Sequence, residues 1–246
     1  MTDCFLSVII PVYNEEKRII NSLKKLDEFI SNNNFNCEII VVDDGSSDNS
    51  CKIVREFFSK LGSNDKYHFD LIENRINRGK GFSVRKGLER AGGKFILFTD
   101  ADFSTPIEEL QKLLGFLNAG YDIAIGSRSL KDSKLIKRQN IFRMYMGKFF
   151  NLMVRLITGL NFVDTQCGFK MFTGGAKNLL LPYLKIDDFS FDVEILYTAK
   201  KLGMKVKEVP VSWINSPDSK VRIIKDSMKM FFTLIKIKKI HSADGF

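Results

Sequence analysis

The sequence predicts an α/β protein with a doubly wound, mostly parallel sheet, and three observations lead to this fold class. Short, nearly continuous apolar runs alternate along the first half of the chain with segments of helical periodicity. The connections between them are short, and polar motifs follow the ends of the apolar runs. Alternation of this kind is typical of strand–helix–strand units whose parallel strands are buried on both faces.

The elements before residue 90 follow this alternation. Residues 5–12 and 37–42 are short, apolar and rich in β-branched side chains, which predicts two buried strands. Asn14 and the acidic residues after it are expected to open a helix behind the first strand. A shorter strand is predicted at 69–72, and the basic glycine loop 77–81 leads into another helix. Helical periodicity is carried by Ile19, Leu23, Leu26 and Ile30, and then by Ile53, Val54, Phe57 and Leu61.

The chain changes character after a strand at 94–99, a helix at 108–117 and a strand at 121–125. Residues 138–160 and 216–246 combine apolar side chains with many basic ones. For 138–160 this pattern fits a helix in a membrane interface and equally fits a surface helix packed on its own sheet, whereas the two segments together favour contact with a membrane surface. We expect residues 1–215 to form one domain that includes the amphipathic helix 138–160. Residues 216–246 are then a C-terminal basic amphipathic segment with a helix.

Composition narrows the classes of function. The chain has 246 residues and a formal net charge of +9, which suits nucleic acid, anionic lipid or phosphorylated ligands. A nucleic-acid recognition motif is missing, so nucleic acid is not an expected partner. Two histidines and four scattered cysteines disfavour a zinc site or a Ser-His-Asp triad. Because no signal peptide and no apolar run of about 20 residues is visible, we expect a cytoplasmic protein that contacts membranes peripherally.

Polar motifs follow four of the predicted strands, at residues 11–15, 42–46, 100–102 and 126–128. The carboxyl ends of parallel strands meet at one edge of a sheet, where open α/β sheets bind their ligands. Asp100 and Asp102 form an Asp-x-Asp pair at this edge. Paired carboxylates hold Mg²⁺ or Mn²⁺, and such a cation bridges to phosphate oxygens. The sequence therefore predicts a divalent cation and a phosphorylated ligand.

These motifs resemble those of the inverting family 2 glycosyltransferases, which have the GT-A fold. The resemblance covers roughly residues 5–215 and rests on four segments, namely Val8–Glu15, Glu38–Ser46, Asn77–Gly81 and Asp100–Asp102. Asp164–Lys170, with Gly126–Arg128 upstream, narrows the resemblance to the dolichyl-phosphate β-glucosyltransferases. These are relatives of the dolichyl-phosphate mannose synthases and of bacterial polyprenyl-phosphate glycosyltransferases.

The resemblance implies a nucleotide-sugar site with Mg²⁺ or Mn²⁺ held by Asp100 and Asp102. Ser104 stands where related mannose synthases often have a glutamine ligand, which leaves the third ligand open, with water as the alternative. Lys80 lies between two glycines and is a further candidate for the donor phosphates or base; the alternative is a solvated loop lysine. The candidate donor-binding residues are Pro11, Tyr13, Glu15, Val42, Asp44, Lys80, Asp100, Ala101, Asp102 and Arg128.

When a sugar–diphosphate bond is cleaved, the negative charge of the leaving diphosphate must be neutralised, and the cation and Arg128 can do this. An attacking phosphate is largely a dianion at neutral pH, so it needs positive charge for positioning more than it needs a strong base. The candidates for holding this acceptor phosphate are Arg138, Arg143 and Lys148. The candidate catalytic residues are Asp102, Asp164 and Arg128.

Three other carboxylates have open roles. Asp164 acts as a base or holds a sugar hydroxyl, and its structural alternative is a loop cap. Asp192 and Glu194 either face the acceptor or orient basic residues.

The expected activity is metal-dependent transfer of glucose from UDP-glucose to a polyprenyl phosphate, with inversion, at the cytoplasmic face of a membrane. One alternative within the family is GDP-mannose as donor or a saccharide as acceptor. Another is a nucleotide-sugar-binding protein without turnover. The sequence leaves the oligomeric state open.

Overall fold

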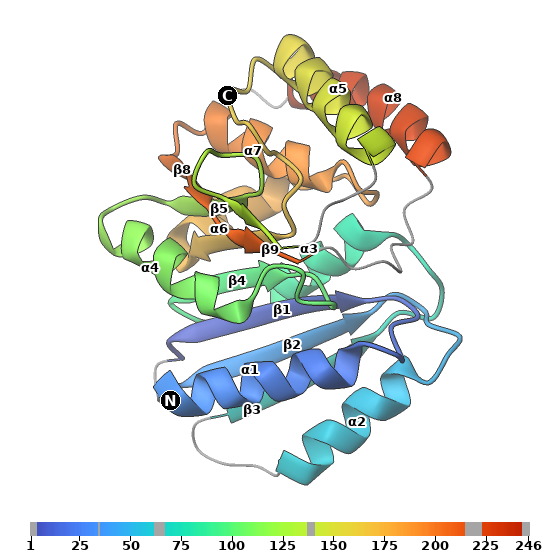
Figure 1. Cartoon of the computed structure of the whole chain (residues 1–246), viewed down its shortest axis with the longest axis vertical. Coiled ribbons are helices and arrows are strands. Elements are labelled where there is room, and N and C mark those ends of the chain that lie inside the picture. Colours follow the sequence, from blue (N-terminus) through green and yellow to red (C-terminus); the bar gives the residue numbers. More distant parts are fainter. Residues whose placement is uncertain (1–3, 34, 62–66, 137–140, 215–222, 243–246) are drawn as a thin grey trace.

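The computed structural model describes residues 4–33, 35–61, 67–136, 141–214 and 223–242, which form a seven-stranded sheet with helices on both faces (Figure 1). The strands are β1 (Leu6–Val12), β2 (Cys37–Asp43), β3 (Tyr67–Glu73), β4 (Phe95–Thr99), β5 (Ile123–Ser127), β7 (Phe169–Thr173) and β8 (Val206–Pro210). β6 (Lys134–Leu135) and β9 (Ser212–Trp213) form a separate parallel pair. The helices are α1 (Ile19–Asn33), α2 (Ser50–Leu61), α3 (Lys80–Arg90), α4 (Leu110–Asn118), α5 (Ile141–Thr158), α6 (Gly174–Leu180), α7 (Phe191–Lys201) and α8 (Ile223–Ser242).

The strand order is β3-β2-β1-β4-β7-β5-β8, and every pair except those of β7 is parallel. The predicted doubly wound, mostly parallel sheet is therefore confirmed. The antiparallel β7 was not predicted. Its first residue, Phe169, pairs with Thr99 at the end of β4. This pairing brings the loop that precedes β7 to the same edge of the sheet as the Asp-x-Asp pair.

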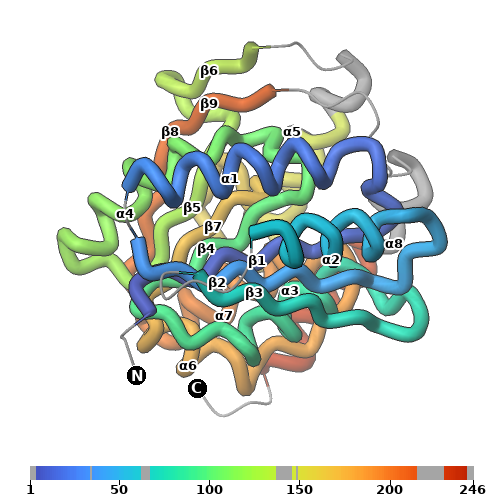
Figure 2. The backbone as a smooth tube through the Cα atoms, turned by 90° about the horizontal axis from the view of Figure 1, so that it is seen from below, coloured from blue at the N-terminus to red at the C-terminus, as the bar shows by residue number. Residues whose placement is uncertain are grey.

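Two apolar layers cover the sheet, as the continuous apolar strands require. Val8 and Ile10 of β1 pack with α1, α2 and α4, whereas Ile9 between them packs with the helices on the other face. Figure 2 shows α1 on one side of the sheet and α3, α6 and α7 on the other. Both faces of β1 are thus buried, and the polar residues that follow Val12 lie at the carboxyl edge of the sheet.

The helix after β1 begins at Ile19 and not at Asn14, as the sequence had suggested. Asn14 has a left-handed backbone with φ 53°, a conformation that Asn tolerates better than most residues. Its side-chain oxygen accepts a hydrogen bond from the Ser47 amide at 2.8 Å, and its own amide donates to the Ser46 hydroxyl at 2.8 Å. Residues 14–18 therefore form a turn that ties the ends of β1 and β2 together.

α5 and α8 lie side by side at one end of the molecule (Figure 1). Phe150 and Val154 of α5 and Leu234 and Ile237 of α8 are buried in the second apolar layer. Other apolar side chains of the pair face outward, including Phe149, which is 59% exposed. Within the part of the chain that the structure describes, every helix is too short or too polar to cross a bilayer.

Candidate active site

The polar motifs meet at the carboxyl edge of the sheet, after β1, β2, β4 and β5. Of the predicted donor residues at the first two strands, Pro11 and Val42 are buried in β1 and β2. Tyr13 extends from the next turn and is 41% exposed. Glu15 receives a bidentate contact from Arg18, with both distances 2.7 Å. Only Tyr13 of these four therefore offers a large exposed side chain to a ligand.

Asp44 organises the glycine loop in front of α3. One carboxylate oxygen accepts the Arg78 amide at 2.9 Å and the other accepts the Gly79 amide at 2.8 Å. Gly79 has φ 108°, and a Cβ there would lie 2.3 Å from the carbonyl oxygen of Asp187. Only glycine fits this position without strain. Asp44, predicted as a donor-binding residue, thus fixes the loop that presents Lys80.

Each carboxylate of the Asp-x-Asp pair faces a basic side chain. The Lys80 Nζ lies 2.5 Å from Asp100 Oδ1, and the Arg18 Nη1 lies 3.3 Å from Asp102 Oδ2. Burial lowers the pKa of Lys80, but the nearby carboxylates, Asp100 foremost, outweigh this effect and raise the pKa above its ordinary value. Lys80 is therefore a stable cation beside the predicted diphosphate position.

The turn that carries the pair is shaped by its own backbone. Phe103 has φ 45°, unusual for a bulky residue, and strain of this kind is concentrated at functional sites. The Ser104 amide donates to Asp102 Oδ1 at 3.0 Å, and the Ser104 carbonyl accepts the Ile214 amide at 2.7 Å. Ala101 is buried beneath the turn. Through its backbone, Ser104 orients Asp102 and joins the turn to the residues after β9.

Gly168 lies directly against Asp100. Its carbonyl oxygen accepts the Asp100 amide at 3.1 Å, and a Cβ on Gly168 would come within 2.1 Å of the Asp100 carboxylate. The loop before β7 therefore sets the position of this carboxylate by close approach.

Gly168→Ala is expected to displace Asp100 and to lower kcat about a hundredfold, because small misplacement of reacting groups has effects of this size. Gly175→Ala is the matched control, since a Cβ there meets nothing within 4 Å. Steady-state rates of both variants, with thermal melting as a check on folding, test this. Equal activity of the two variants would show that the position of Asp100 does not matter.

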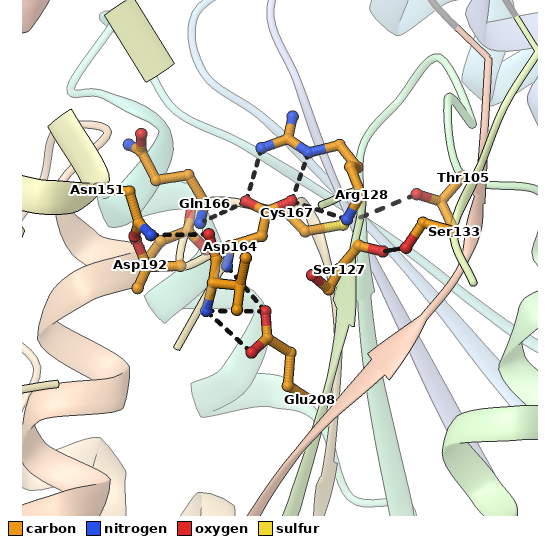
Figure 3. Close-up of polar contacts among 12 residues, drawn as sticks. Thr105, Ser127, Arg128, Ser133, Asn151, Asp164, Gln166, Cys167, Asp192 and Glu208 are labelled. Atoms are coloured by element: carbon orange, nitrogen blue, oxygen red, sulfur yellow. Dashed lines mark hydrogen bonds and ion pairs between the residues drawn. The ribbon is translucent and has the colours of Figure 1, made fainter. Parts of the chain in front are cut away.

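Arg128 forms an ion pair with the buried Asp164, in which the half-buried guanidinium lies across the carboxylate (Figure 3). Nε donates to Oδ2 at 2.7 Å and Nη2 donates to Oδ1 at 2.8 Å, while the Arg128 amide donates to Oδ2 at 3.0 Å. Burial raises the pKa of Asp164, but Arg128 outweighs it, so this pKa is lowered. Both carboxylate oxygens are engaged. This arrangement suits Asp164 to hold Arg128 in place better than to accept a proton.

Two residues of this region, Arg18 and Lys170, were not predicted as site residues. Arg18 reaches Asp102 from the turn before α1. Lys170 is fully buried on β7, where its Nζ contacts Asp192 Oδ1 and the Cys167 carbonyl. Burial raises the pKa of Asp192, against the opposing effect of Lys170 and Lys80. The sequence does contain a signal for Lys170, since it is a single lysine within the apolar run Phe169–Phe172. A lysine buried in a strand needs an acidic partner, so this position predicts an ion pair.

The predicted acceptor-phosphate residues lie at or beyond the limit of the description. Arg138 lies outside the described residues. Arg143 and Lys148 belong to α5, but their side chains are outside the description.

Asp100 and Asp102 could supply oxygen ligands to a hard cation. No group of three or more His, Cys, Asp or Glu side chains suited to a metal occurs among the described residues. Mg²⁺ commonly uses one or two carboxylates and completes its shell with substrate phosphates and water. Asp100 contacts Lys80 and Asp102 contacts Arg18, so the negative charge of this site already attracts positively charged groups. The pair therefore fits a cation that is bound together with a diphosphate.

Comparison with known proteins gives the family. A family model described as glycosyl transferase family 2 matches residues 7–175. A dolichyl-phosphate β-glucosyltransferase from Dictyostelium discoideum is 34% identical over 244 residues, which are 95% of this chain and 74% of that protein. The enzyme of the same name from Saccharomyces cerevisiae is 35% identical over 251 residues, 96% of this chain and 75% of that one.

Solved structures share the fold. The glucosyl-3-phosphoglycerate synthase of Mycobacterium tuberculosis, crystallised with Mn²⁺ and UDP-glucose, superposes with a TM-score of 0.70 at 16% identity, covering 95% of this chain and 78% of that one. Its complex with UDP gives 0.67 at 17% identity, over 95% and 79% of the two chains. The matched family segment begins in β1 and includes the Asp-x-Asp turn, Arg128 and Asp164. The chain belongs to glycosyl transferase family 2.

Proposed function

We propose that the protein transfers glucose from UDP-glucose to a polyprenyl phosphate of the dolichyl type, with a divalent cation and inversion at the sugar. The observation that carries this proposal is the cluster of Asp100, Asp102, Lys80 and Arg18 at the carboxyl edge of the sheet. The relatives described as dolichyl-phosphate β-glucosyltransferases support the acceptor and the sugar. The complex of a structural neighbour with Mn²⁺ and UDP-glucose supports the donor and the cation.

The donor diphosphate lies against the Asp-x-Asp turn in this proposal. Mg²⁺ or Mn²⁺ held by Asp100 and Asp102 would neutralise charge on the leaving diphosphate. Lys80 exchanges its contact with Asp100 for the phosphates, and Arg128, held by Asp164, stabilises the same developing charge. Pro11, Tyr13, Glu15 and Val42 border the nucleoside, whereas Asp44 acts through the loop at 77–79.

The acceptor phosphate attacks the anomeric carbon from the side opposite the diphosphate. A new carbon–oxygen bond forms as the bond to UDP breaks, and the electron pair leaves on the diphosphate. This single displacement gives the β-linked product. Because the attacking oxygen carries charge already, cations near it are more useful than a base, and Arg138, Arg143 and Lys148 are proposed for this task.

Peripheral contact with a membrane completes the proposal. α5 exposes Phe149, Leu152 and Leu156, which follow one face at helical spacing, and Leu156 is 70% exposed. Phe232 and Ile235 of the adjacent α8 are also exposed, Phe232 by 64%. Adjacent exposed apolar faces mark interaction surfaces. Together with the net charge of +9, these exposed faces fit the surface of an anionic leaflet. We propose that this leaflet is the cytoplasmic one.

The domain division follows from the same proposal. Residues 1–215 form the glycosyltransferase domain, and residues 216–246 form an extension whose helix α8 packs beside α5 and exposes an apolar face.

The test is a transfer assay with UDP-glucose and a polyprenyl phosphate in neutral detergent, with Mn²⁺ or with chelator. We expect a glucosylated lipid only with the cation, and a rise in melting temperature of about 5 °C or more at a hundredfold excess of UDP-glucose over its Kd. GDP-mannose and saccharide acceptors form the other arms. Turnover only with GDP-mannose would overturn the donor, and binding without turnover would overturn the enzyme assignment.

A further inference from the structure

A cavity of about 420 Å³ lies between α8 and two loops that flank the proposed active site. Arg78 and Gly79 line it from the loop before α3, and Lys185, Asp187 and Asp188 line it from the loop before α7. Thr233 and Lys236 of α8 close the third side. Its volume is that of a small-molecule site. Among the described residues that line it, none is a predicted donor residue.

The acidic side chains of this cavity have partners. Asp187 Oδ1 lies 2.6 Å from Arg85 Nη2. Asp188 accepts the Ser190 amide at 2.8 Å through Oδ1 and the Thr233 hydroxyl at 3.1 Å through Oδ2. The charge of Asp187 is balanced by Arg85, and the Asp188 carboxylate is oriented by the two hydrogen bonds.

Two basic side chains of the cavity, Arg78 and Lys236, are less satisfied. Within the described part of the chain, neither Arg78 nor Lys236 has a carboxylate within ion-pair distance, and the Arg78 guanidinium lies 3.8 Å from the centre of the Phe82 ring. Lys185 and Lys236 are both exposed at the mouth. A cavity with Arg78 and Lys236 from two separate elements and its acids already engaged favours an anionic ligand.

The same segment of α8 faces the proposed membrane surface. Phe232 and Ile235 are exposed, and Thr233 and Lys236 follow them on the adjacent stripe of the helix, at the cavity. If Phe232 and Ile235 enter the acyl boundary, Lys236 and the cavity mouth lie at the level of the lipid headgroups. Snorkelling lysines commonly occupy that level.

We propose that this cavity binds the phosphate-bearing headgroup of an anionic phospholipid and so orients the enzyme on its membrane. The proposal rests on the membrane contact in the proposed function. It adds a lipid site separate from the donor and acceptor sites. The cavity wall also reaches the catalytic edge, since the Asp187 carbonyl accepts the Gly81 amide at 2.8 Å, one residue from Lys80.

The experiment is cosedimentation of the full chain with vesicles of phosphatidylcholine, alone or mixed with phosphatidylserine. Lys185→Glu/Lys236→Glu is expected to weaken binding to the mixed vesicles about tenfold or more, since each basic contact with an anionic surface has a several-fold effect. Lys238→Glu/Lys239→Glu is the matched control, because both lysines are exposed on α8 outside the cavity and the charge change is identical. We expect this pair to lose at least about threefold less binding than the cavity pair, because it removes only surface charge outside the cavity. Melting temperatures verify folding.

Equal losses in the two double variants would overturn the proposal, because diffuse charge would then explain the binding. Unchanged binding of the cavity variant would overturn it as well. A raised KM for polyprenyl phosphate in neutral detergent would assign the cavity to the acceptor instead. Absence of transfer by the wild type would contradict only the proposed function, since the vesicle comparison does not depend on turnover.

Discussion

Asp102→Asn is expected to lower kcat for sugar transfer by about a hundred- to a thousandfold, the size of effect seen when one stabilising group at a developing charge is removed. Asparagine keeps the shape of the side chain and an oxygen that accepts the Ser104 amide. It removes the negative charge that faces Arg18 and that would hold the cation. The fold should therefore persist while the leaving diphosphate loses its charge compensation.

The measurement compares kcat across a Mn²⁺ titration for the wild type, Asp102→Asn and Glu28→Gln. Glu28 is exposed on α1, away from the edge, and undergoes the same loss of charge. The apparent affinity for Mn²⁺ in the presence of UDP-glucose should fall in Asp102→Asn alone. Activity of this variant at the level of Glu28→Gln would contradict the assignment of Asp102.

The sheet could be predicted because its parallel strands are nearly continuous apolar runs followed by polar turns. Val8 and Ile10 enter one layer and Ile9 the other, which is the burial that such runs indicate. The antiparallel β7 escaped prediction, since the order of strands in a sheet depends on pairing between distant segments and not on local pattern. Asn14 and the acidic residues after it also suggested a helix start at Asn14, where hydrogen bonds with Ser46 and Ser47 hold a turn instead.

The candidate site was predictable where function needs residue types at fixed spacing, as at Asp100 and Asp102. The basic residues that pair with these carboxylates through tertiary contacts could not be predicted. Arg18 meets Asp102 across 84 residues of sequence, and Lys170 meets Asp192 across 22. For Asp164 and Asp192 the structure favours the role of holding a basic residue, because Asp164 pairs with Arg128 and Asp192 pairs with Lys170. A sequence pattern indicates which residue types lie at the strand ends. It does not indicate which of the charged residues form ion pairs with each other.

Lys170→Met is expected to destabilise the protein by about 3–5 kcal/mol, because removal of one partner leaves a charge buried without compensation. Lys170 is fully buried, and Asp192 is nearly so. The melting temperature should fall by about 10 °C. The exposed pair Arg90–Asp70 gives the matched control, in which Arg90→Met should cost less than about 1 kcal/mol. Lys170→Met/Asp192→Leu should recover most of the loss, since apolar side chains often replace a buried ion pair without net cost.

The stability of Lys170→Met should also depend on pH in a definite direction. Burial already raises the pKa of Asp192 above its ordinary value of 3.8, and Lys170 opposes this rise, so the variant's folded-state pKa must be higher still. Between 3.8 and that higher pKa, the folded state binds more protons than the unfolded state, and stability falls as pH rises. Urea unfolding at a series of pH values should therefore show the variant approaching the wild type on acidification from neutral pH. A constant difference between the two proteins would mean that Asp192 is not the group left charged, and that lost packing of the lysine side chain causes the destabilisation.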